Sequence, residues 1–205
     1  MPSYKLQYFH SRGFAEASRQ LFALSSTPYE DVRIEKEDWP SHKASTPFGQ
    51  MPVLFVDGQP LPQSSAITRY LAKEFGFAGK TAYEAAWVDA LGDQFKDYFT
   101  EIRPLFMAQW GMGGDKDELL KSVGELTRDK HMAIYEKTLK ENKSGFLVGD
   151  SLTWIDLVSA EHVASLSDLL PGFLDGFPEL AKHSTRIHET PKLKEWIEKR
   201  PKTAF

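Results

Sequence analysis

The spacing of apolar and polar positions near the start of the chain changes from a strand pattern to a helical one. Residues 4–9 alternate in polarity up to an aromatic pair, which predicts a strand. Apolar residues then recur at helical spacing from Phe14 to Leu24, and a second alternating run covers residues 29–34. A helix between two such strands favours a right-handed crossover with parallel pairing. The first 34 residues are therefore predicted to form a βαβ unit.

A second group of elements follows a polar loop. An apolar segment runs from Pro52 to Val56, and the turn pair Asp57-Gly58 leads into a short segment that ends at Pro62. A helical pattern then extends from Ser65 to about Phe75. The order βαβ followed by ββα is that of a small thioredoxin-like domain, which we predict for residues 1–78.

Strand signals stop beyond this point. Residues 82–110, 117–142 and 153–170 all carry helical patterns, and Pro104 predicts a kink or a local break inside the first of them. We therefore expect an all-helical domain over residues 82–205, and the fold class α+β.

Three of the later helices have recognisable starts. Pro178 and Pro191 suit the first turns of the last two helices. Thr153 can cap a helix while Asp156 reaches back to it, with Leu152 and Leu157 placed as a hydrophobic staple. That helix is expected to begin sharply, and its capping residues have a structural role.

Composition narrows the chemistry. The net charge is -4, so no sequence-wide attraction to nucleic acid or to anionic lipid is expected. The chain has no cysteine, which excludes disulfides, thiolate metal ligands and a cysteine nucleophile. His183 and His188 lack the spacing of a metal site, and no metal is expected. Neither a signal segment nor an apolar run of about 18 residues is found, so a cytoplasmic protein without a membrane segment is the expectation.

Tyr8 is the first candidate for chemistry. It closes the first predicted strand, so its hydroxyl could lie beside the electropositive start of the following helix and donate a hydrogen bond to an anion. A tyrosine in a strand is more often a core aromatic with a satisfied hydroxyl. Position alone leaves both interpretations open.

The loops contain further candidate groups. If the Met51–Pro52 bond is cis, the backbone groups of Met51 could pair with a peptide, and Ser64 or Ser65 could cap a helix that receives a carboxylate. Trp39 and Lys43, four residues apart, could offer an indole N–H and an ammonium to a second carboxylate. The alternatives are an ordinary capped helix and an ordinary surface pair.

Several fragments together resemble the sigma class of glutathione transferases, and its nematode type in particular. The fragments are Tyr4-Lys-Leu-Gln-Tyr8-Phe9 with Arg12-Gly13, Glu37-Asp-Trp39-Pro40 with Lys43, Pro47-Phe-Gly-Gln-Met-Pro52, Gln63-Ser64, Asp93-Gln-Phe-Lys-Asp97, and Gly145-Phe-Leu-Val-Gly149-Asp-Ser-Leu-Thr153. The similarity continues to Arg200-Pro201, so it spans the chain. Each fragment alone is weak, whereas their combination is specific.

The resemblance implies a glutathione transferase that acts in detoxification by conjugating glutathione to apolar electrophiles, with Tyr8 stabilising the thiolate. The glutathione contacts that it implies are Tyr8, Trp39, Lys43, Gly49, Gln50, Met51, Pro52, Gln63, Ser64 and Asp97. Asp97 would reach glutathione in the other subunit of a homodimer. The residues expected around the electrophile are Phe9, Arg12, Phe14, Phe99, Arg103, Met107 and Phe205.

One departure from the family pattern bears on the substrate. Members that isomerise prostaglandin H to prostaglandin D carry a second arginine two residues after the one matching Arg12, where this chain has Phe14. The resemblance therefore gives weaker support to a glutathione-dependent prostaglandin isomerase than to a conjugating enzyme. A protein of the same fold that binds haem or another hydrophobic ligand is the main alternative, and a purely structural protein ranks last.

Overall fold

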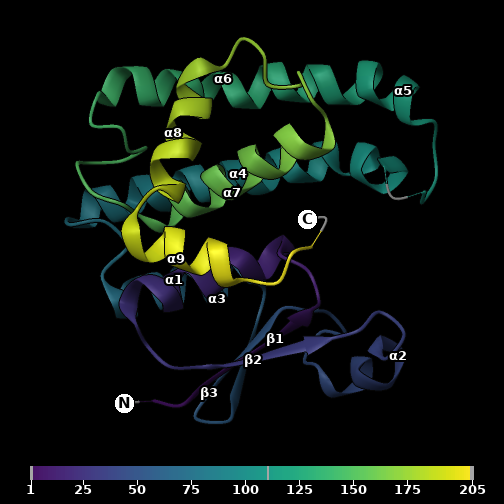
Figure 1. Cartoon of the computed structure of the whole chain (residues 1–205), viewed down its shortest axis with the longest axis vertical. Coiled ribbons are helices and arrows are strands. Elements are labelled where there is room, and N and C mark those ends of the chain that lie inside the picture. Colours follow the sequence, from purple (N-terminus) through teal and green to yellow (C-terminus); the bar gives the residue numbers. More distant parts are fainter. Residues whose placement is uncertain (1, 110, 204–205) are drawn as a thin grey trace. The chain divides into compact units, whose positions relative to one another are not determined.

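The computed structural model describes residues 2–109 and 111–203 and divides the chain into two compact units (Figure 1). The first unit contains the described residues up to Ala78 together with those from Ile187 onward, and the second contains Gly79–Arg186. The first is a thioredoxin-like domain and the second is helical, which confirms the predicted fold class. The division after residue 78 lies where the sequence pattern changes, whereas the C-terminal residues return to the first unit.

The first unit is built on a mixed sheet of four strands in the order β2-β1-β3-β4. The strands are β1 (Tyr4–Phe9), β2 (Glu30–Ile34), β3 (Val53–Val56) and β4 (Gln59–Pro62). β2 pairs parallel to β1, as the crossover helix requires, and β3 pairs antiparallel to both β1 and β4. The polarity pattern thus gave the correct strands.

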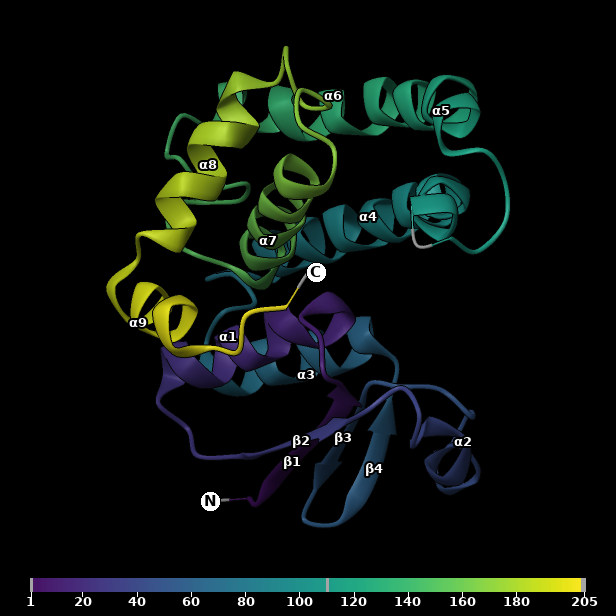
Figure 2. The same ribbon diagram turned by 45° about the vertical axis from the view of Figure 1, so that its right-hand side comes forward.

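Two helices cover one face of this sheet (Figures 1 and 2). They are α1 (Glu16–Ser25), which follows a short 3₁₀ turn at Gly13–Ala15, and α3 (Ser64–Phe75). Tyr4 of β1 meets Phe22 of α1 and Phe75 of α3 edge to face, with ring centroids 5.4 and 6.0 Å apart. Since side chains alternate along a strand, Leu6 and Tyr8 point to the same covered face.

Helix α9 (Pro191–Lys199) packs on α1 within the first unit (Figure 2), which also contains the short helix α2 (Trp39–His42). Leu193 is fully buried, and Trp196 donates its indole N–H to a carboxylate oxygen of Glu16 at 2.7 Å. Arg200 contacts the same oxygen at 2.8 Å. These contacts explain why the C-terminal residues belong with the sheet domain.

The second unit consists of helices. They are α4 (Ala82–Gln109), α5 (Lys116–Leu119), a π-helical turn (Leu120–Gly124), α6 (Glu125–Asn142), α7 (Trp154–Leu169) and α8 (Pro178–His188), which crosses the boundary to the first unit. Of the kink or local break predicted at Pro104, the break does not form: α4 continues through the proline. Pro104 and Thr100, whose carbonyl loses its helical partner, are both exposed, so water can satisfy that carbonyl.

The sequence pattern over 117–142 predicted one helix, and the structure interrupts it. A carboxylate oxygen of Asp115 accepts the backbone N–H of Glu118 at 2.9 Å and so caps the beginning of α5. The π-helical turn ends at Gly124, where an added Cβ would lie 2.7 Å from Cδ2 of Leu105 on α4. The turn therefore brings backbone close to the neighbouring helix.

The predicted capping box of α7 is present. One oxygen of Asp156 accepts the backbone N–H of Thr153 at 2.8 Å and its hydroxyl at 2.7 Å. The other oxygen accepts the N–H of Leu147 at 2.8 Å and lies 2.9 Å from Nε2 of His183 on α8. A single buried carboxylate thus joins a loop and two helices.

Candidate functional site

The hydroxyl of Tyr8 lies where β1 ends and the first helical turn begins. The side chain is buried, and its oxygen accepts the backbone N–H of Phe14 at 3.3 Å. Gly13 has φ +38°, and a Cβ added there would come within 2.7 Å of the hydroxyl oxygen. A glycine therefore lets the backbone pass over the tyrosine.

Burial raises the pKa of Tyr8, while the N–H of Phe14, the charge of Arg19 and the hydroxyl of Ser11 act in the opposite direction. Because the net shift is upward, the phenol stays protonated at neutral pH. Its oxygen already accepts one hydrogen bond from the backbone, so its own hydrogen is available to an anion. The surroundings suit a hydrogen-bond donor rather than a base.

A second group of predicted residues gathers on the other face of β1. Phe9 meets the ring of Trp39 edge to face, with centroids 5.6 Å apart. Trp39 begins the short helix α2 (Trp39–His42), and Lys43 opens the 3₁₀ turn that follows. An added Cβ at Gly49 would lie 3.5 Å from Cε of Lys43. Trp39, Lys43 and Gly49 therefore form one neighbourhood beside the strand.

The loop before β3 and the start of α3 also lie together. The Met51–Pro52 peptide bond is cis, the condition under which the backbone of Met51 could pair with a peptide, and Pro52 is buried. The side-chain amide of Gln63 donates to the side-chain oxygen of Gln50 at 3.4 Å. Gln63 itself has φ +76°, an unusual value for a residue with a side chain, which costs on the order of 1–3 kcal/mol. Such strain is concentrated at functional sites, and no pattern of residues around Gln63 predicts it.

The prediction that Ser64 or Ser65 caps α3 is wrong. Ser64 is the first residue of the helix, Gln63 occupies the cap position, and no side chain caps it. Gln63 at the cap position has φ +76° and ψ 115°, an uncommon backbone conformation, and the helical backbone begins at Ser64. The first N–H groups of α3 therefore have no side-chain acceptor in the described chain, which is the arrangement that binds anions.

The other predicted site residues divide between the two units. Phe9, Arg12 and Phe14 belong to the first unit, where Arg12 is buried and Phe14 is 43% exposed. On α4 of the second unit, Phe99, Arg103 and Met107 follow at intervals of four and share one helix face, and Asp97 is exposed. Phe205 lies outside the described residues.

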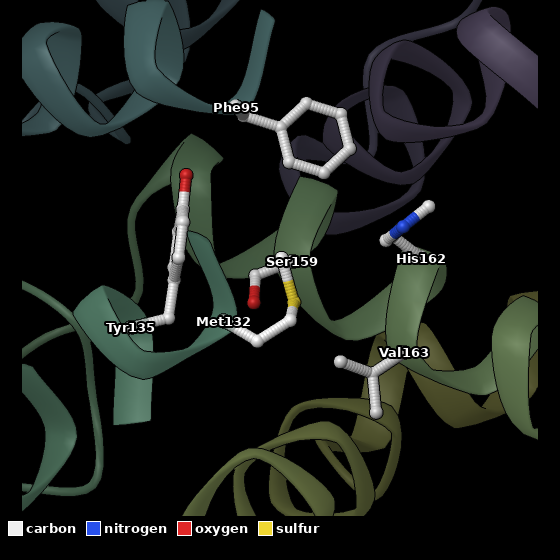
Figure 3. A pocket seen from close by; sticks show the side chains of 6 residues that line it. All are labelled: Phe95, Met132, Tyr135, Ser159, His162 and Val163. Carbon is white, nitrogen blue, oxygen red and sulfur yellow. The ribbon is translucent and has the colours of Figure 1, made fainter. Parts of the chain in front are cut away.

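A small pocket in the second unit contains none of the predicted residues (Figure 3). It encloses about 180 Å³ of empty space, some of it open to solvent, and is lined by Phe95, Met132, Tyr135, Ser159, His162 and Val163. Burial lowers the pKa of His162 to about 3, so its ring is neutral, and Nε2 lies 2.9 Å from the hydroxyl of Tyr98. The pocket is smaller than a typical ligand site.

Sequence reasoning missed Arg19, which is fully buried on α1. It pairs with Asp31 of β2 at 3.1 Å and lies near Glu16 at 3.5 Å. The signal available in the sequence was the spacing of Glu16 and Arg19, three residues apart on a helix. The partner on β2 could not be read from that spacing.

The described residues offer neither a cluster of metal ligands nor a helix suited to a membrane. Within residues 2–109 and 111–203, no group of three or more His, Cys, Asp or Glu residues could hold a metal ion. Over the same residues, no helix is both long and apolar enough to cross a membrane.

Comparisons with known proteins cover the whole chain. The family models for the N-terminal and C-terminal domains of glutathione S-transferases match residues 4–73 and 96–200. The chain is 52% identical to probable glutathione S-transferase 9 of Caenorhabditis elegans, and each covers all of the other. A Nu-class GST structure from Haemonchus contortus is 53% identical over all of both chains, with a TM-score of 0.91. The structure of a GST from Necator americanus, described as monomeric, is 48% identical over 99% of this chain and 100% of its own, with a TM-score of 0.95.

The fold and the site identify the class of protein, in which a thioredoxin-like domain is followed by an all-helical domain. The chain belongs to the glutathione S-transferase family and to its nematode type, which is Nu-class and sigma-like. It is a glutathione S-transferase that uses glutathione as co-substrate with electrophiles.

Proposed function

We propose that this transferase conjugates glutathione to apolar electrophiles in detoxification, and that the Tyr8 hydroxyl stabilises the thiolate. The observation that carries the proposal is the hydrogen bond from the Phe14 N–H to the Tyr8 oxygen. It fixes the hydroxyl at the start of a helical segment, with its own hydrogen left to donate. The tyrosine acts as a hydrogen-bond donor to sulfur throughout the reaction.

The energy required is of a size that one hydroxyl can supply. A free alkyl thiol titrates near pH 8.5, so about 3% is thiolate at pH 7. Lowering the pKa of the bound thiol by about two units makes most of it reactive and requires roughly 2.7 kcal/mol. A charge-assisted hydrogen bond to a thiolate, aided by a helix start, is worth about that much.

The rest of glutathione is bound by the neighbourhoods around Tyr8. Lys43 and the indole N–H of Trp39 bind the glycine carboxylate, and the backbone of Met51 aligns the cysteinyl part. The γ-glutamyl end is held by Gln63 and Ser64 at the start of α3. The uncapped N–H groups of α3 and the bond between Gln63 and Gln50 support this assignment. Gly49, Gln50 and Pro52 shape the loop between these two ends.

A homodimer completes the proposed site, with Asp97 binding the ammonium of glutathione in the partner subunit. Asp97 is exposed on α4, and Tyr83, Trp87 and Ala90 lie exposed along the same helical stripe. A stripe with two exposed aromatic rings favours contact with another protein surface. The GST structure from Necator americanus is described as monomeric, which is the opposite of the homodimer proposed for this chain.

The electrophile is proposed to be apolar and uncharged. The exposed ring of Phe14 supports this, as do Phe9 and the α4 residues Phe99 and Met107, whereas Arg12 and Arg103 supply polar edges. Haem, another hydrophobic ligand or prostaglandin H are the alternative ligands, and the cytoplasm is the proposed compartment. Consumption of glutathione with a chromogenic electrophile distinguishes conjugation from mere binding.

Replacement of Tyr8 by Phe tests the central assignment. We expect kcat/KM to fall by about 100-fold below the pKa of the wild-type bound thiol, because that pKa returns toward about 8.5. The defect should shrink as the pH rises through 8.5, where the variant also forms thiolate. Below the pKa of the wild-type bound thiol, glutathione affinity should change little, because ionisation then makes no contribution to binding. A variant that binds glutathione poorly but turns over normally would contradict the proposed role.

A further inference from the structure

The side chain of Arg19 is buried beside the Tyr8 ring and connects it to the rest of the first unit. Its guanidinium carbon lies 5.9 Å from the centroid of the Tyr8 ring. One terminal nitrogen, Nη1, donates to the backbone carbonyl of Ser11 at 2.6 Å, and Nε donates to Asp31 at 3.1 Å. The other terminal nitrogen, Nη2, has no hydrogen-bond partner among the described residues.

The bond to Ser11 fixes one end of the segment that contacts the Tyr8 hydroxyl. Ser11 and Phe14 lie at the two ends of the turn between β1 and α1, and Phe14 donates its N–H to Tyr8. The turn is otherwise held by short backbone bonds, such as the one from the Ser11 N–H to the Phe9 carbonyl at 2.7 Å. Arg19 thus ties this turn to the sheet through Asp31.

The position of Arg19 is itself fixed by its carboxylate partners. Glu16 lies 3.5 Å from Nη1 of Arg19, and its other oxygen binds Trp196 and Arg200 of the C-terminal segment. Asp31 binds both Arg19 and Arg33. A guanidinium held at a fixed angle by several partners presents its charge to Tyr8 in one orientation.

We propose that Arg19 is a positioning residue for thiolate formation: it holds the turn that orients the Tyr8 hydroxyl, and its charge lies over the Tyr8 ring. The proposal rests on the function proposed for Tyr8. The positive charge makes the phenol a stronger hydrogen-bond donor, since it stabilises the negative charge that develops on the phenol oxygen as the hydroxyl donates. The charge of Arg19 lowers the pKa of Tyr8 whereas burial raises it, which agrees with this effect. Arg19 itself contacts neither glutathione nor the electrophile.

The measurement is the pKa of the bound glutathione thiol, read from the ultraviolet difference absorbance of the thiolate as the pH is varied. Arg19→Met should raise that pKa by about half a unit to one unit, which leaves about 3- to 10-fold less thiolate at low pH. The Kd for glutathione, measured below the pKa of the bound thiol so that ionisation does not contribute to binding, should stay within about twofold, because Arg19 does not touch the peptide. A purely structural role would lower Tm without moving the thiol pKa in the folded protein.

Two further variants separate the contributions of Arg19. Arg19→Lys keeps the charge but loses the planar fork that reaches Ser11 and Asp31, so it should raise the thiol pKa by less than Arg19→Met does. It also decides the test if Arg19→Met does not fold: an unchanged thiol pKa in Arg19→Lys then overturns the proposal. Arg33→Met is the matched control, because Arg33 shares Asp31 but has no hydrogen bond to the turn in the described chain. If Arg33→Met raises the thiol pKa as much as Arg19→Met does, the loss of any nearby positive charge is enough to explain the effect, and the positioning role of Arg19 is refuted.

A double-mutant cycle with Tyr8→Phe distinguishes failure of this inference from failure of the proposed function. If Arg19 acts through Tyr8, Arg19→Met should have no further effect on the thiol pKa in the Tyr8→Phe background. An equal effect in both backgrounds would overturn the positioning role. If Tyr8→Phe alone leaves the thiol pKa unchanged, the function proposed for Tyr8 fails. A raised thiol pKa in Tyr8→Phe, with a normal one in both Arg19 variants, rejects only the role of Arg19.

Discussion

Each unit contains a buried carboxylate in the first turn of a helix, and the two carboxylates have different partners. Asp156 on α7 accepts backbone N–H groups of Leu147 and Thr153, together with one His183 contact. Glu16 on α1 contacts only side chains in the described chain, namely Arg19, Trp196 and Arg200. Backbone donors are rigid and local, whereas long cationic side chains connect distant segments.

This difference predicts different consequences of mutation. In the second unit, removal of the carboxylate leaves backbone N–H donors without an acceptor, so the expected effect is a loss of folding stability. In the first unit the charged network extends from the C-terminal segment to the turn above Tyr8, so a change there alters the chemistry as well. Separate measurements of Tm and of the thiol pKa therefore test the comparison.

The largest effect is expected for Asp156→Ala. It leaves His183 and two backbone N–H groups without their buried acceptor, which costs about 3–5 kcal/mol. For a chain of this size Tm should fall by roughly 10 °C, measured by calorimetry. Asp150→Ala is the control, because Asp150 makes an exposed ion pair with Lys80 and should matter little. An equal fall in Tm for Asp156→Ala and Asp150→Ala would contradict the role given to the buried contacts of Asp156.

A steric prediction follows from Gly92 on α4. An added Cβ would lie 2.0 Å from Cη2 of Trp154, a rigid ring buried at the start of α7. Gly92→Ala should therefore destabilise the protein by about 1–3 kcal/mol through overpacking. Gly124→Ala is the matched variant, since its Cβ would come too close only to the end of the Leu105 side chain, which can move, and would make ordinary contacts with Leu120 and Phe173. Chemical denaturation should rank Gly92→Ala as the more costly, and the reverse order would contradict the packing argument.

The proposed homodimer is tested by replacing Asp97. Asp97→Ala should weaken glutathione binding by about 1–3 kcal/mol in calorimetry, because the ammonium group of glutathione loses its charged partner. The Tm should not fall. Asp97→Asn keeps the shape of the side chain and should lose less glutathione affinity than Asp97→Ala does. Light scattering on the unmodified protein should give twice the 23.3 kDa chain mass. A fully active monomer would refute the role of Asp97.

The smallest effect concerns the strained backbone of Gln63. Gln63→Gly removes the steric cost of φ +76°, which offsets the entropy that glycine loses on folding, so stability should change by less than about 1 kcal/mol. Gln63→Ala keeps the strain and should be the less stable of the two. Both variants should raise KM for glutathione, with kcat nearly unchanged, because they lose the same side-chain contact. A change confined to kcat would disprove binding by Gln63.

Most of the fold could be predicted because its elements are encoded locally. Period-two polarity gave the strands and helical spacing gave the helices, and the capping box from Thr153 to Asp156 joins residues only three apart. The failures have local causes that polarity does not reveal. Exposure lets α4 continue through Pro104, and Gln63 rather than a serine occupies the cap position of α3.

The candidate site was predicted in part. Family resemblance named Tyr8 and the loop residues, and the structure brings Trp39 to Lys43 and Gln50 to Gln63 within the first unit. Arg19 escaped prediction because its spacing from Glu16 indicates only a local pair on a helix and not a buried side chain with a partner on β2. Its importance depends on which atoms surround it, and these come from separate segments.

The sequence by itself determined the elements, their order, the change of fold class near residue 78 and the family. Only the tertiary structure decided that the C-terminal segment joins the sheet domain and that Glu16 and Arg19 support the turn above Tyr8. The reason is separation along the chain: Trp196 binds Glu16 across 180 residues. Local polarity can specify which face of a helix is buried, but the partner of a buried charge is fixed only when distant segments pack and water is excluded.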